Sequence, residues 1–353
     1  MPTRRELLSL GCAFAATSMF PRISSAQASA AAPGPVADPL NYVNPEFRDA
    51  VKRMHLQPGA NKPWDAAMLK KARAGGMEFP VPPSPAIREV MIPGPAGAPQ
   101  VKVYVTGDAP GAAKPAVLHI HGGGYILGSA RDSRTMIQEL ATTHDCVAAT
   151  VEYRLAPETA FPGSLEDNYA ALRWMHANAK DLGIDVSRIA IKGESAGGGH
   201  AAALAIAARD RGEFPICLQV LIYPMLDDRT GSTRKLPPFM GMYIWTPEDN
   251  RFGWSSLLGV PAGSANVPPN SVPARVENLA GLPPAWIGVG SIDLFAPEDL
   301  EYAKRLMLAG VPVEANLVPG GFHAFDMIAA GTSLARQFKE SYNEAIRRAF
   351  AKA

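Results

Sequence analysis

The chain has 353 residues, of which 47% are hydrophobic and 19% are charged, and its formal net charge is +1. A chain of this length can bury a large core, in one large domain or two smaller ones. The near-neutral charge balance lacks the clustered Lys and Arg of a nucleic-acid-binding surface, so no nucleic-acid partner is expected.

Residues 1–30 have the layout of a cleavable export signal. Arg4 and Arg5 come first, an apolar stretch follows, and small residues end the segment in A-x-A patterns at 26–28 and 28–30. The Arg pair resembles a twin-arginine signal, which predicts a periplasmic or secreted bacterial protein. The apolar stretch is shorter than the ~20 residues of a spanning helix, so no stable membrane anchor is expected. The alternative is a disordered or anchoring N-terminus.

Two weak helical patterns, at 45–55 and 64–75, follow a Pro- and Ala-rich segment, and from residue 87 the pattern changes. Short β-branched runs that end in Gly, Pro or charge predict strands at 87–94, 100–107, 115–124, 146–154, 188–195, 218–224, 285–293 and 313–321. Helical patterns lie at 133–144, 164–183, 197–212, 298–310 and 333–353. This alternation predicts an α/β fold with a mainly parallel sheet.

The third predicted strand ends in His121-Gly122-Gly123-Gly124. Acyl transfer places negative charge on a former carbonyl oxygen, and backbone N–H groups held close to that oxygen stabilise it. Because glycines let the backbone come that close, we expect Gly123 and Gly124, with Gly122 as a further candidate, to donate to an oxyanion. His121 is expected to hold the loop by hydrogen bonding, and His119 to lie in the core. The alternative is a flexible glycine turn.

The sequence Gly193-Glu194-Ser195-Ala196-Gly197 lies between a predicted strand and a predicted helix. In a G-x-S-x-G motif the glycines allow a sharp turn, which lifts the serine hydroxyl off the sheet and exposes it. The following helix points its N-terminus at this hydroxyl and favours a developing negative charge there. We therefore expect Ser195 to be a nucleophile and the amide of Ala196 to join the oxyanion hole. A turn serine that caps a helix is the alternative.

An acid and a histidine are expected to follow such a serine in the chain. Beyond His200, which lies in the helix just after the serine, the only later histidine is His323, at the end of a predicted strand. Asp293 ends an apolar strand, at the edge where the loops of a parallel sheet gather. We therefore expect Asp293 to be the acid, with Asp326 as the alternative.

Other polar groups of this region are given structural roles. The carboxylates of the following helix are expected to be capping or surface charges; they are Glu298, Asp299 and Glu301. Cys146 and Cys217 lie in apolar runs and are expected to be buried and unpaired, although an oxidising compartment would allow them to pair. No cofactor is expected, and no metal site, because no carboxylate or cysteine lies at ligand spacing from the histidines of residues 119–121.

Residues 228–284 interrupt the alternation with charges, prolines and aromatic residues. A long insert after a strand is a candidate lid or cap, because loops of that length are usually functional or disordered. Its large apolar side chains either line an acyl or aryl pocket or pack inside the cap; they are Met240, Met242, Tyr243, Trp245 and Trp254.

These elements resemble the hormone-sensitive-lipase-like branch of the α/β-hydrolases, a family of bacterial short-chain esterases and arylacetamide deacetylases. The resemblance runs from about residue 95 to the C-terminus, and it rests on His121–Gly124, Tyr153–Glu158 with Phe161-Pro162, Gly193–Gly198, Asp293–Phe295 and Gly321–His323. It implies an α/β-hydrolase fold in which an eight-stranded, mostly parallel sheet carries helices on both faces. It also implies a helical cap built from residues 31–85 and 228–280, with 86–353 as the catalytic domain. Glu194 departs from the pattern, because aspartate or threonine is commoner there.

Residues and resemblance together predict a serine carboxylesterase that acts on short- to medium-chain acyl or aryl esters through an acyl-enzyme intermediate. Ser195 is the expected nucleophile, His323 the base and Asp293 the group that orients it. An amidase or lactonase with the same triad is one alternative, and a non-catalytic small-molecule-binding protein is another, because a fold does not determine a function. The expected partner is a small-molecule ester, and a homodimer is compatible with the sequence.

Overall fold

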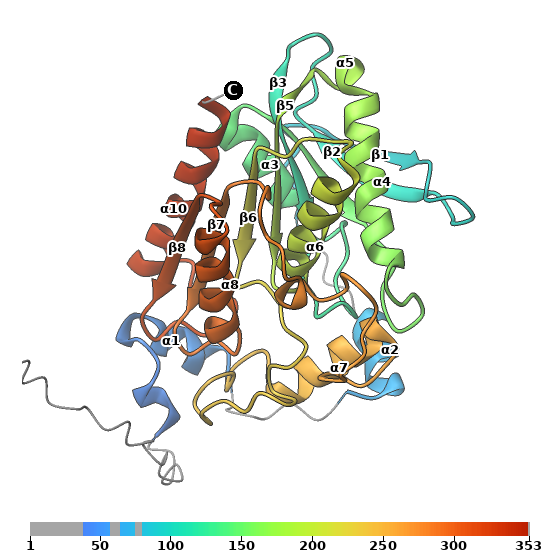
Figure 1. Cartoon of the computed structure of the whole chain (residues 1–353). Helices are drawn as coiled ribbons and strands as arrows, with labels where there is room; N and C mark the ends of the chain where they lie inside the picture. The colour runs from blue at the N-terminus through green and yellow to red at the C-terminus, as the bar shows by residue number, and fades with distance from the viewer. Residues whose placement is uncertain (1–37, 57–63, 75–79, 352–353) are drawn as a thin grey trace, which may run out of the picture. The chain divides into compact units, whose positions relative to one another are not determined.

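The computed structural model describes residues 38–56, 64–74 and 80–351, and a single sheet of eight strands runs through them (Figure 1). The predicted export signal, residues 1–30, lies outside the described residues. The strands are β1 (Ile87–Ile92), β2 (Val101–Thr106), β3 (Lys114–Ile120), β4 (Val147–Glu152), β5 (Ile184–Glu194), β6 (Leu218–Ile222), β7 (Ala285–Gly290) and β8 (Val313–Val318). Each lies where an apolar run predicts a strand.

The sheet is mostly parallel. Its strand order is β1-β2-β4-β3-β5-β6-β7-β8, in which β2 is antiparallel to both β1 and β4 and all other neighbours are parallel. Helical crossovers connect the parallel strands, so their carboxyl ends meet at one edge. The expected α/β-hydrolase architecture is confirmed.

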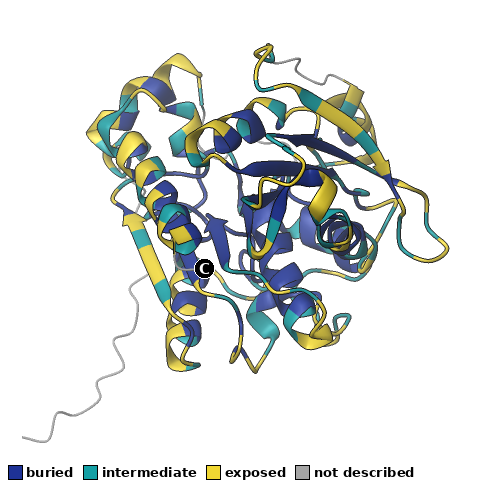
Figure 2. Cartoon of the chain, turned by 90° about the horizontal axis from the view of Figure 1, so that it is seen from above, coloured by how far each residue is buried: buried dark blue, intermediate teal, exposed yellow. Residues whose placement is uncertain are grey.

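Helices cover both faces of the sheet. On one face α3 (Arg134–His144) and α10 (Ser333–Ala351) pack against the strands. On the other face lie α4 (Gly163–Ala177), α6 (Ala196–Arg211) and α8 (Ala296–Leu308). Seen from above, the central strands are buried, whereas the outer sides of the helices are exposed (Figure 2). This arrangement explains why the sequences of the central strands β4, β6 and β7 are almost continuously apolar.

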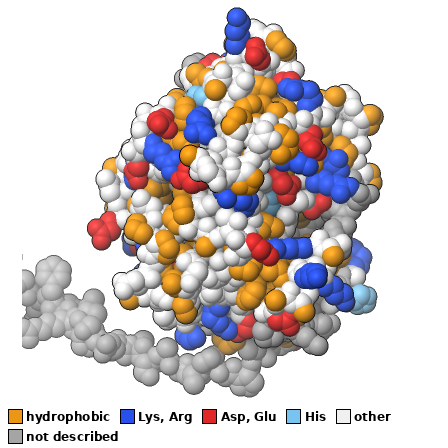
Figure 3. Space-filling view, turned by 90° about the vertical axis from the view of Figure 1, so that its right-hand side faces the viewer, with side chains coloured by type: hydrophobic (Ala, Val, Ile, Leu, Met, Phe, Trp, Pro, Cys, Tyr) orange, Lys and Arg blue, Asp and Glu red, His pale blue; other side chains and the backbone are white. Residues whose placement is uncertain are grey.

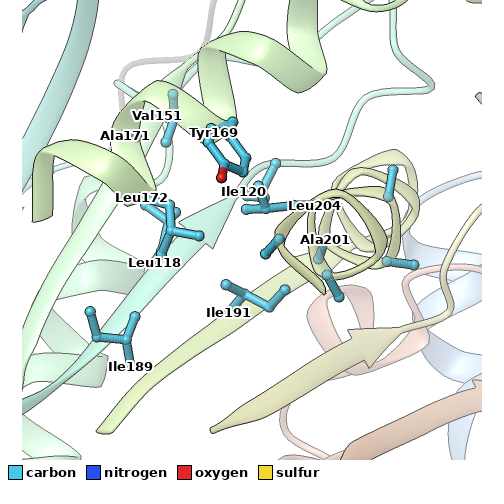
Figure 4. Packing of buried hydrophobic residues seen from close by; sticks show 14 of the residues in the cluster. Leu118, Ile120, Val151, Tyr169, Ala171, Leu172, Ile189, Ile191, Ala201 and Leu204 are labelled. Atoms are coloured by element: carbon cyan, nitrogen blue, oxygen red, sulfur yellow. The ribbon is translucent and has the colours of Figure 1, made fainter. Parts of the chain in front are cut away.

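The packing of α6 brings the helix close to the strands that carry the site. Ile191 of β5 and Ile120 of β3 lie beside Ala201 and Leu204 of α6 (Figure 4), and all four are fully buried. The first ten residues of α6, 196–205, are all Gly or Ala except His200 and Leu204, so its backbone can approach the sheet closely. On the far side Leu172 of α4 completes this part of the core.

The insert between β6 and β7 contains a helix that the sequence analysis did not predict, α7 (Pro247–Leu258). Thr246 caps it, since its hydroxyl accepts from Asp249 N while the Asp249 carboxylate accepts from Thr246 N. The weak N-terminal patterns form α1 (Pro45–Arg53) and α2 (Ala66–Ala74). Leu69 of α2 belongs to the same apolar cluster as Trp254 of α7, and Figure 1 shows the two helices side by side. The division into cap and catalytic domain stays a prediction.

The remaining elements are short: α5 (Ala179–Leu182), α9 (Phe325–Ile328) and the 3-10 turns η1 (Pro39–Asn41) and η2 (Pro273–Arg275). Charged side chains of both signs are interspersed with hydrophobic ones on the face shown in Figure 3. Neither Cys146, which is buried, nor Cys217, which is half-buried just before β6, forms a disulfide. Among the helices of the described ranges, none combines the length and apolar character that crossing a bilayer requires.

Candidate active site

Ser195 lies in a strained turn between β5 and α6. Its φ is 57° and its ψ −121°, a backbone conformation that costs energy for a non-glycine residue. The turn is also crowded: a Cβ at Gly193 would lie 2.2 Å from Gly197 O, and one at Gly197 would lie 2.0 Å from Ile120 O. The glycines on either side of the serine are therefore required by close backbone approach, as the G-x-S-x-G motif predicts.

The structure brings Ser195, His323 and Asp293 together. The Ser195 Oγ lies 2.9 Å from His323 Nε2, and His323 Nδ1 lies 2.8 Å from Asp293 Oδ2. Asp293 is fully buried, and its other oxygen accepts a hydrogen bond from Phe295 N. Because a carboxylate only accepts, His323 Nδ1 carries the proton toward Asp293, which leaves the Nε2 lone pair for the serine hydroxyl.

Asp326, the alternative acid, lies elsewhere. Its carboxyl accepts a hydrogen bond of 2.9 Å from the Tyr223 hydroxyl and makes none to His323. Burial raises the pKa of Asp326 to about 6, with the hydrogen bond from Tyr223 opposing the increase. The rings of Tyr223 and Phe295 pack edge-on against the His323 imidazole, at centroid distances of 4.8 and 5.2 Å. These two rings fix the plane of the imidazole.

The glycine loop after β3 faces the serine. Gly123 and Gly124 have φ values of +123° and +60°, and a Cβ at Gly124 would lie 2.0 Å from the Trp245 ring. Ile126 N and Leu127 N both donate to Gly123 O, which closes the turn. His121 Nδ1 lies 2.8 Å from Gly122 O, so the hydrogen bond expected to hold the loop is present.

Two buried histidines support this loop without charge. The His121 ring stacks on Tyr153 at 4.1 Å, and the Tyr153 hydroxyl donates to His121 O. His200 of α6 packs edge-on against Tyr125 and Tyr153. Burial lowers the pKa of His121 to about 4 and that of His200 to about 3. Both rings are therefore neutral at pH 7 and serve packing.

Beside the serine lies a buried ionic cluster that the sequence analysis missed. Glu194 Oε2 is 2.8 Å from His119 Nε2, and its Oε1 pairs with Lys192 Nζ. Burial alone would raise the pKa of Glu194, but the charge of Lys192 and the hydrogen bond with His119 outweigh it and hold that pKa well below its ordinary value. The i, i+2 spacing of Lys192 and Glu194 places both side chains on one face of the strand, and this is the sequence signal from which the pair could have been found.

A cavity of about 340 Å³ opens over these groups. It is lined by Ser195, His323 and Gly122–Gly124, and by the apolar side chains Met136, Ile244, Trp245 and Met327. Of the five large residues singled out in the insert, only Trp245 lines this cavity. Trp254 packs on Tyr125, Tyr243 packs on Phe322, and Met240 and Met242 line a separate hollow.

The acidic residues of α8 differ from expectation. Glu298 and Asp299 are buried, whereas Glu301 is exposed and pairs with Lys304. Glu298 Oε1 accepts hydrogen bonds from Leu226 N and Asp227 N and so holds the turn after β6. Burial raises the pKa of both buried carboxyls well above the ordinary value. Glu298 thus accepts hydrogen bonds from the backbone of the turn after β6, and not from the N-terminus of its own helix.

Within residues 38–56, 64–74 and 80–351, no three His, Cys, Asp or Glu side chains are placed to hold a metal ion. The arrangement that this part of the chain does present is a serine, a histidine and a carboxylate in hydrogen-bond contact beside a glycine loop. Such an arrangement can carry out nucleophilic acyl transfer.

Known proteins are similar to this chain in fold and in sequence. Residues 117–327 match a family described as alpha/beta hydrolase fold. Esterase LipI of Mycobacterium tuberculosis is 36% identical over 240 residues, which cover 67% of this chain and 74% of that protein. Carboxylesterase NlhH of the same species is 35% identical over 216 residues, 60% of this chain and 66% of NlhH.

Solved structures show the same likeness. A bacterial heroin esterase superposes with a TM-score of 0.76 at 35% identity, covering 88% of this chain and 99% of the esterase. Esterase LipW from Mycobacterium marinum superposes with a TM-score of 0.75 at 30% identity, covering 88% and 97%. Both similarities extend well beyond the matched family segment.

Proposed function

Because the chain belongs to the hormone-sensitive-lipase-like branch of the α/β-hydrolases, we propose that it is a serine carboxylesterase that hydrolyses short- to medium-chain acyl or aryl esters. The observation that carries the proposal is the chain of contacts from Ser195 Oγ through His323 to Asp293, at 2.9 and 2.8 Å, beside an open cavity. The similar proteins named esterases and carboxylesterases support the ester as substrate.

In the first half of the reaction His323 Nε2 takes the Ser195 proton while Ser195 Oγ attacks the ester carbonyl carbon. The negative charge moves to the carbonyl oxygen, which the amides of Gly123, Gly124 and Ala196, with Gly122 as a further candidate, are proposed to stabilise. Removing one such donor typically costs about 2.7–4 kcal/mol of transition-state stabilisation. The tetrahedral intermediate then collapses, and His323 gives its proton to the leaving alkoxide.

In the second half, a water molecule replaces the alcohol. His323 takes a proton from this water, whose oxygen attacks the acyl carbon, and the same proton returns to Ser195 Oγ when the carboxylic acid departs. Asp293 stabilises the imidazolium and fixes its tautomer but does not take its proton. No step in this cycle draws on a cofactor.

The size of the cavity supports short to medium acyl groups. About 340 Å³ lies at the lower end of the volumes of small-molecule sites. The thioethers of Met136 and Met327 and the indole of Trp245 give it apolar walls. Flexible methionine side chains adapt to acyl or aryl groups of different shape.

The test is hydrolysis of p-nitrophenyl esters from acetate to laurate by residues 31–353, with Ser195→Ala as the matched control. We expect activity that peaks among the short chains and falls by at least about 10³-fold in the variant. A negligible rate that is equal in the wild type and the variant would overturn the proposal and favour a binding protein on this scaffold. Parallel assays with matched anilides and lactones identify the preferred leaving group.

We also propose that the protein is exported, on the sequence of residues 1–30. A twin-arginine signal requires both arginines, so Arg4→Lys together with Arg5→Lys is expected to keep a fused reporter in the bacterial cytoplasm. Cell fractionation measures this directly. Equal export of the reporter with and without the two substitutions would contradict a twin-arginine route.

A further inference from the structure

Lys192 is one of the largest fully buried side chains of the described chain, with 1% of its surface exposed. A lysine is almost never buried in this way unless it is paired. Its Nζ contacts the Glu194 carboxylate, approaches Met136 Sδ at 3.5 Å and lies 5.3 Å from the centre of the Tyr342 ring. Glu194 directly precedes Ser195, so the ion pair is anchored in the turn that carries the candidate nucleophile.

The second oxygen of Glu194 reaches the neighbouring strand. It lies 2.8 Å from His119 Nε2, across 75 residues of sequence, and His119 Nδ1 lies 2.9 Å from the Thr150 hydroxyl of β4. In the parallel register His119 is opposite Lys192. His119 is also three residues before Gly122, so this contact joins the serine turn to the strand that ends in the glycine loop.

The two segments meet without intervening space. A Cβ at Gly122 would lie 2.8 Å from Glu194 O and 3.4 Å from Ser195 Cβ. Any slip of β3 along β5 would therefore move the loop amides relative to the Ser195 hydroxyl. A misplacement of about 1 Å can cost about 10²-fold in rate, because the reacting atoms leave the productive geometry.

We propose that Glu194, clamped by Lys192 on one oxygen and bonded to His119 on the other, is a positioning residue that sets the distance between the Ser195 hydroxyl and the oxyanion amides. The inference rests on the proposed esterase function and adds to it the device that aligns the two halves of the site. Both oxygens of Glu194 are already paired, so the carboxylate acts through the backbone rather than on substrate.

Two single variants cut the connection in different places. Glu194→Gln keeps the shape of the side chain but removes its charge. His119→Asn removes the ring nitrogen that contacts Glu194 and keeps a polar group near the position of Nδ1, which contacts Thr150. Each is expected to lower kcat 10- to 100-fold with KM within twofold, and to weaken inhibition by a short-chain trifluoromethyl ketone by the same factor. That ketone forms a tetrahedral adduct on serine, so its affinity reports the oxyanion geometry. His119→Gln keeps a donor near the Nε2 position and is expected to retain most of the activity.

The double variant Glu194→Gln/His119→Asn is expected to be no slower than the slower single variant, because both changes break one connection. Additive losses of kcat and ketone affinity, or wild-type values in both single variants, would overturn the inference. An inactive wild type that does not bind the ketone would instead contradict the proposed function. The two failures are thus distinguishable.

Loss of stability is separated from loss of positioning by two further variants. Lys192→Met/Glu194→Gln removes both charges and is expected to melt at a higher temperature than Lys192→Met, since no unpaired carboxylate stays buried, yet to keep the low kcat. Leu172→Ala, a core truncation on α4, is expected to lower the melting temperature with unchanged kcat and ketone affinity. If kcat follows the melting temperature across all variants, the role of Glu194 is merely structural and the inference is wrong.

Discussion

Four side chains hold the His323 imidazole in place, and this arrangement would let one ring serve as the base in both halves of the proposed reaction. Its two nitrogens meet Asp293 and Ser195, while the rings of Tyr223 and Phe295 pack against it. A preorganised ring needs no rearrangement between acylation and deacylation. Of the two candidate acids, Asp293 contacts the imidazole directly, whereas Asp326 contacts Tyr223.

We expect Asp293→Asn to lower kcat by about 10³- to 10⁴-fold, because an amide NH₂ facing His323 Nδ1 stabilises the tautomer that cannot accept the serine proton. Asp326→Asn is the matched control and is expected to cost less than about tenfold, since its contact is with Tyr223. Steady-state kinetics on p-nitrophenyl acetate measure both. The reverse order of losses would make Asp326 the acid.

The same Asp326→Asn variant tests a dependence of stability on pH. The pKa of half-buried Asp326 is raised to about 6 from an ordinary value near 3.8, so between these values the folded chain keeps a proton that the unfolded chain has lost. The stability that the folded chain gains by keeping this proton is fully present below about pH 4 and is lost as the pH rises through about 6. One pKa unit corresponds to about 1.4 kcal/mol, which makes the loss about 3 kcal/mol.

Asparagine does not titrate, so the variant lacks this loss. Its free energy of unfolding relative to the wild type is expected to rise by about 3 kcal/mol between pH 4 and pH 7. Denaturant unfolding at several pH values measures the difference between the two proteins, in which the titrations that both share cancel. A difference that does not change with pH would contradict the raised pKa.

At the scale of elements, the junction of β5 and α6 depends on how closely three backbone segments approach. Gly197→Ala would place a methyl group 2.0 Å from Ile120 O, whereas a Cβ at Gly331 meets nothing within 4 Å. We expect Gly197→Ala to cost about 3 kcal/mol of stability and most of the activity, through displacement of the strand. Gly331→Ala is expected to change stability by less than about 0.5 kcal/mol. Equal melting temperatures of the two variants would show that the junction is not tight.

The elements with a clear period were predictable from the sequence, and the helix without one was not. The central strands β3, β4, β6 and β7 coincide with apolar runs because parallel strands buried on both faces carry a continuous apolar signal. The edge strands β1 and β8 are more exposed and mix apolar with polar residues. The helix α7 was missed because the insert reads as loop in composition, although Thr246 and Asp249 have the spacing of a capping box. The start of α7 was therefore predictable from Thr246 and Asp249, which a search for apolar periodicity does not consider.

The site divides in the same way. Ser195, Asp293 and His323 follow from chain order and strand ends, so their positions were predictable. The contact of Glu194 with His119 was not, because it depends on the register of two strands 75 residues apart in sequence. The residues that line the cavity were not predictable either. The five large residues of the insert are all apolar, and only their packing in the fold shows that Trp245 lines the cavity and the others do not.

At the scale of the whole chain, Arg73 connects the N-terminal helix α2 to the rest of the fold. Arg73 of α2 donates to Ile126 O at 2.9 Å and Ala156 O at 2.6 Å, and pairs with Glu158 at 2.8 Å. Ile126 closes the turn of the glycine loop through its N–H, and its carbonyl is one of the three acceptors of Arg73. Arg73 therefore attaches α2 to the fold and supports the glycine loop at the same time.

Arg73→Met is expected to loosen α2 locally. Its three contacts are partly exposed, so we assign them about 2 kcal/mol together, which corresponds to about thirtyfold faster amide hydrogen exchange in α2. Lys70→Met, on the exposed side of the same helix, is the control and is expected to leave exchange unchanged. Exchange measured by mass spectrometry on peptides covering residues 64–74 reports both. If the two variants exchange alike, Leu69 and the apolar cluster hold α2 without Arg73; if only Arg73→Met exchanges faster, the guanidinium is what keeps this helix beside the site.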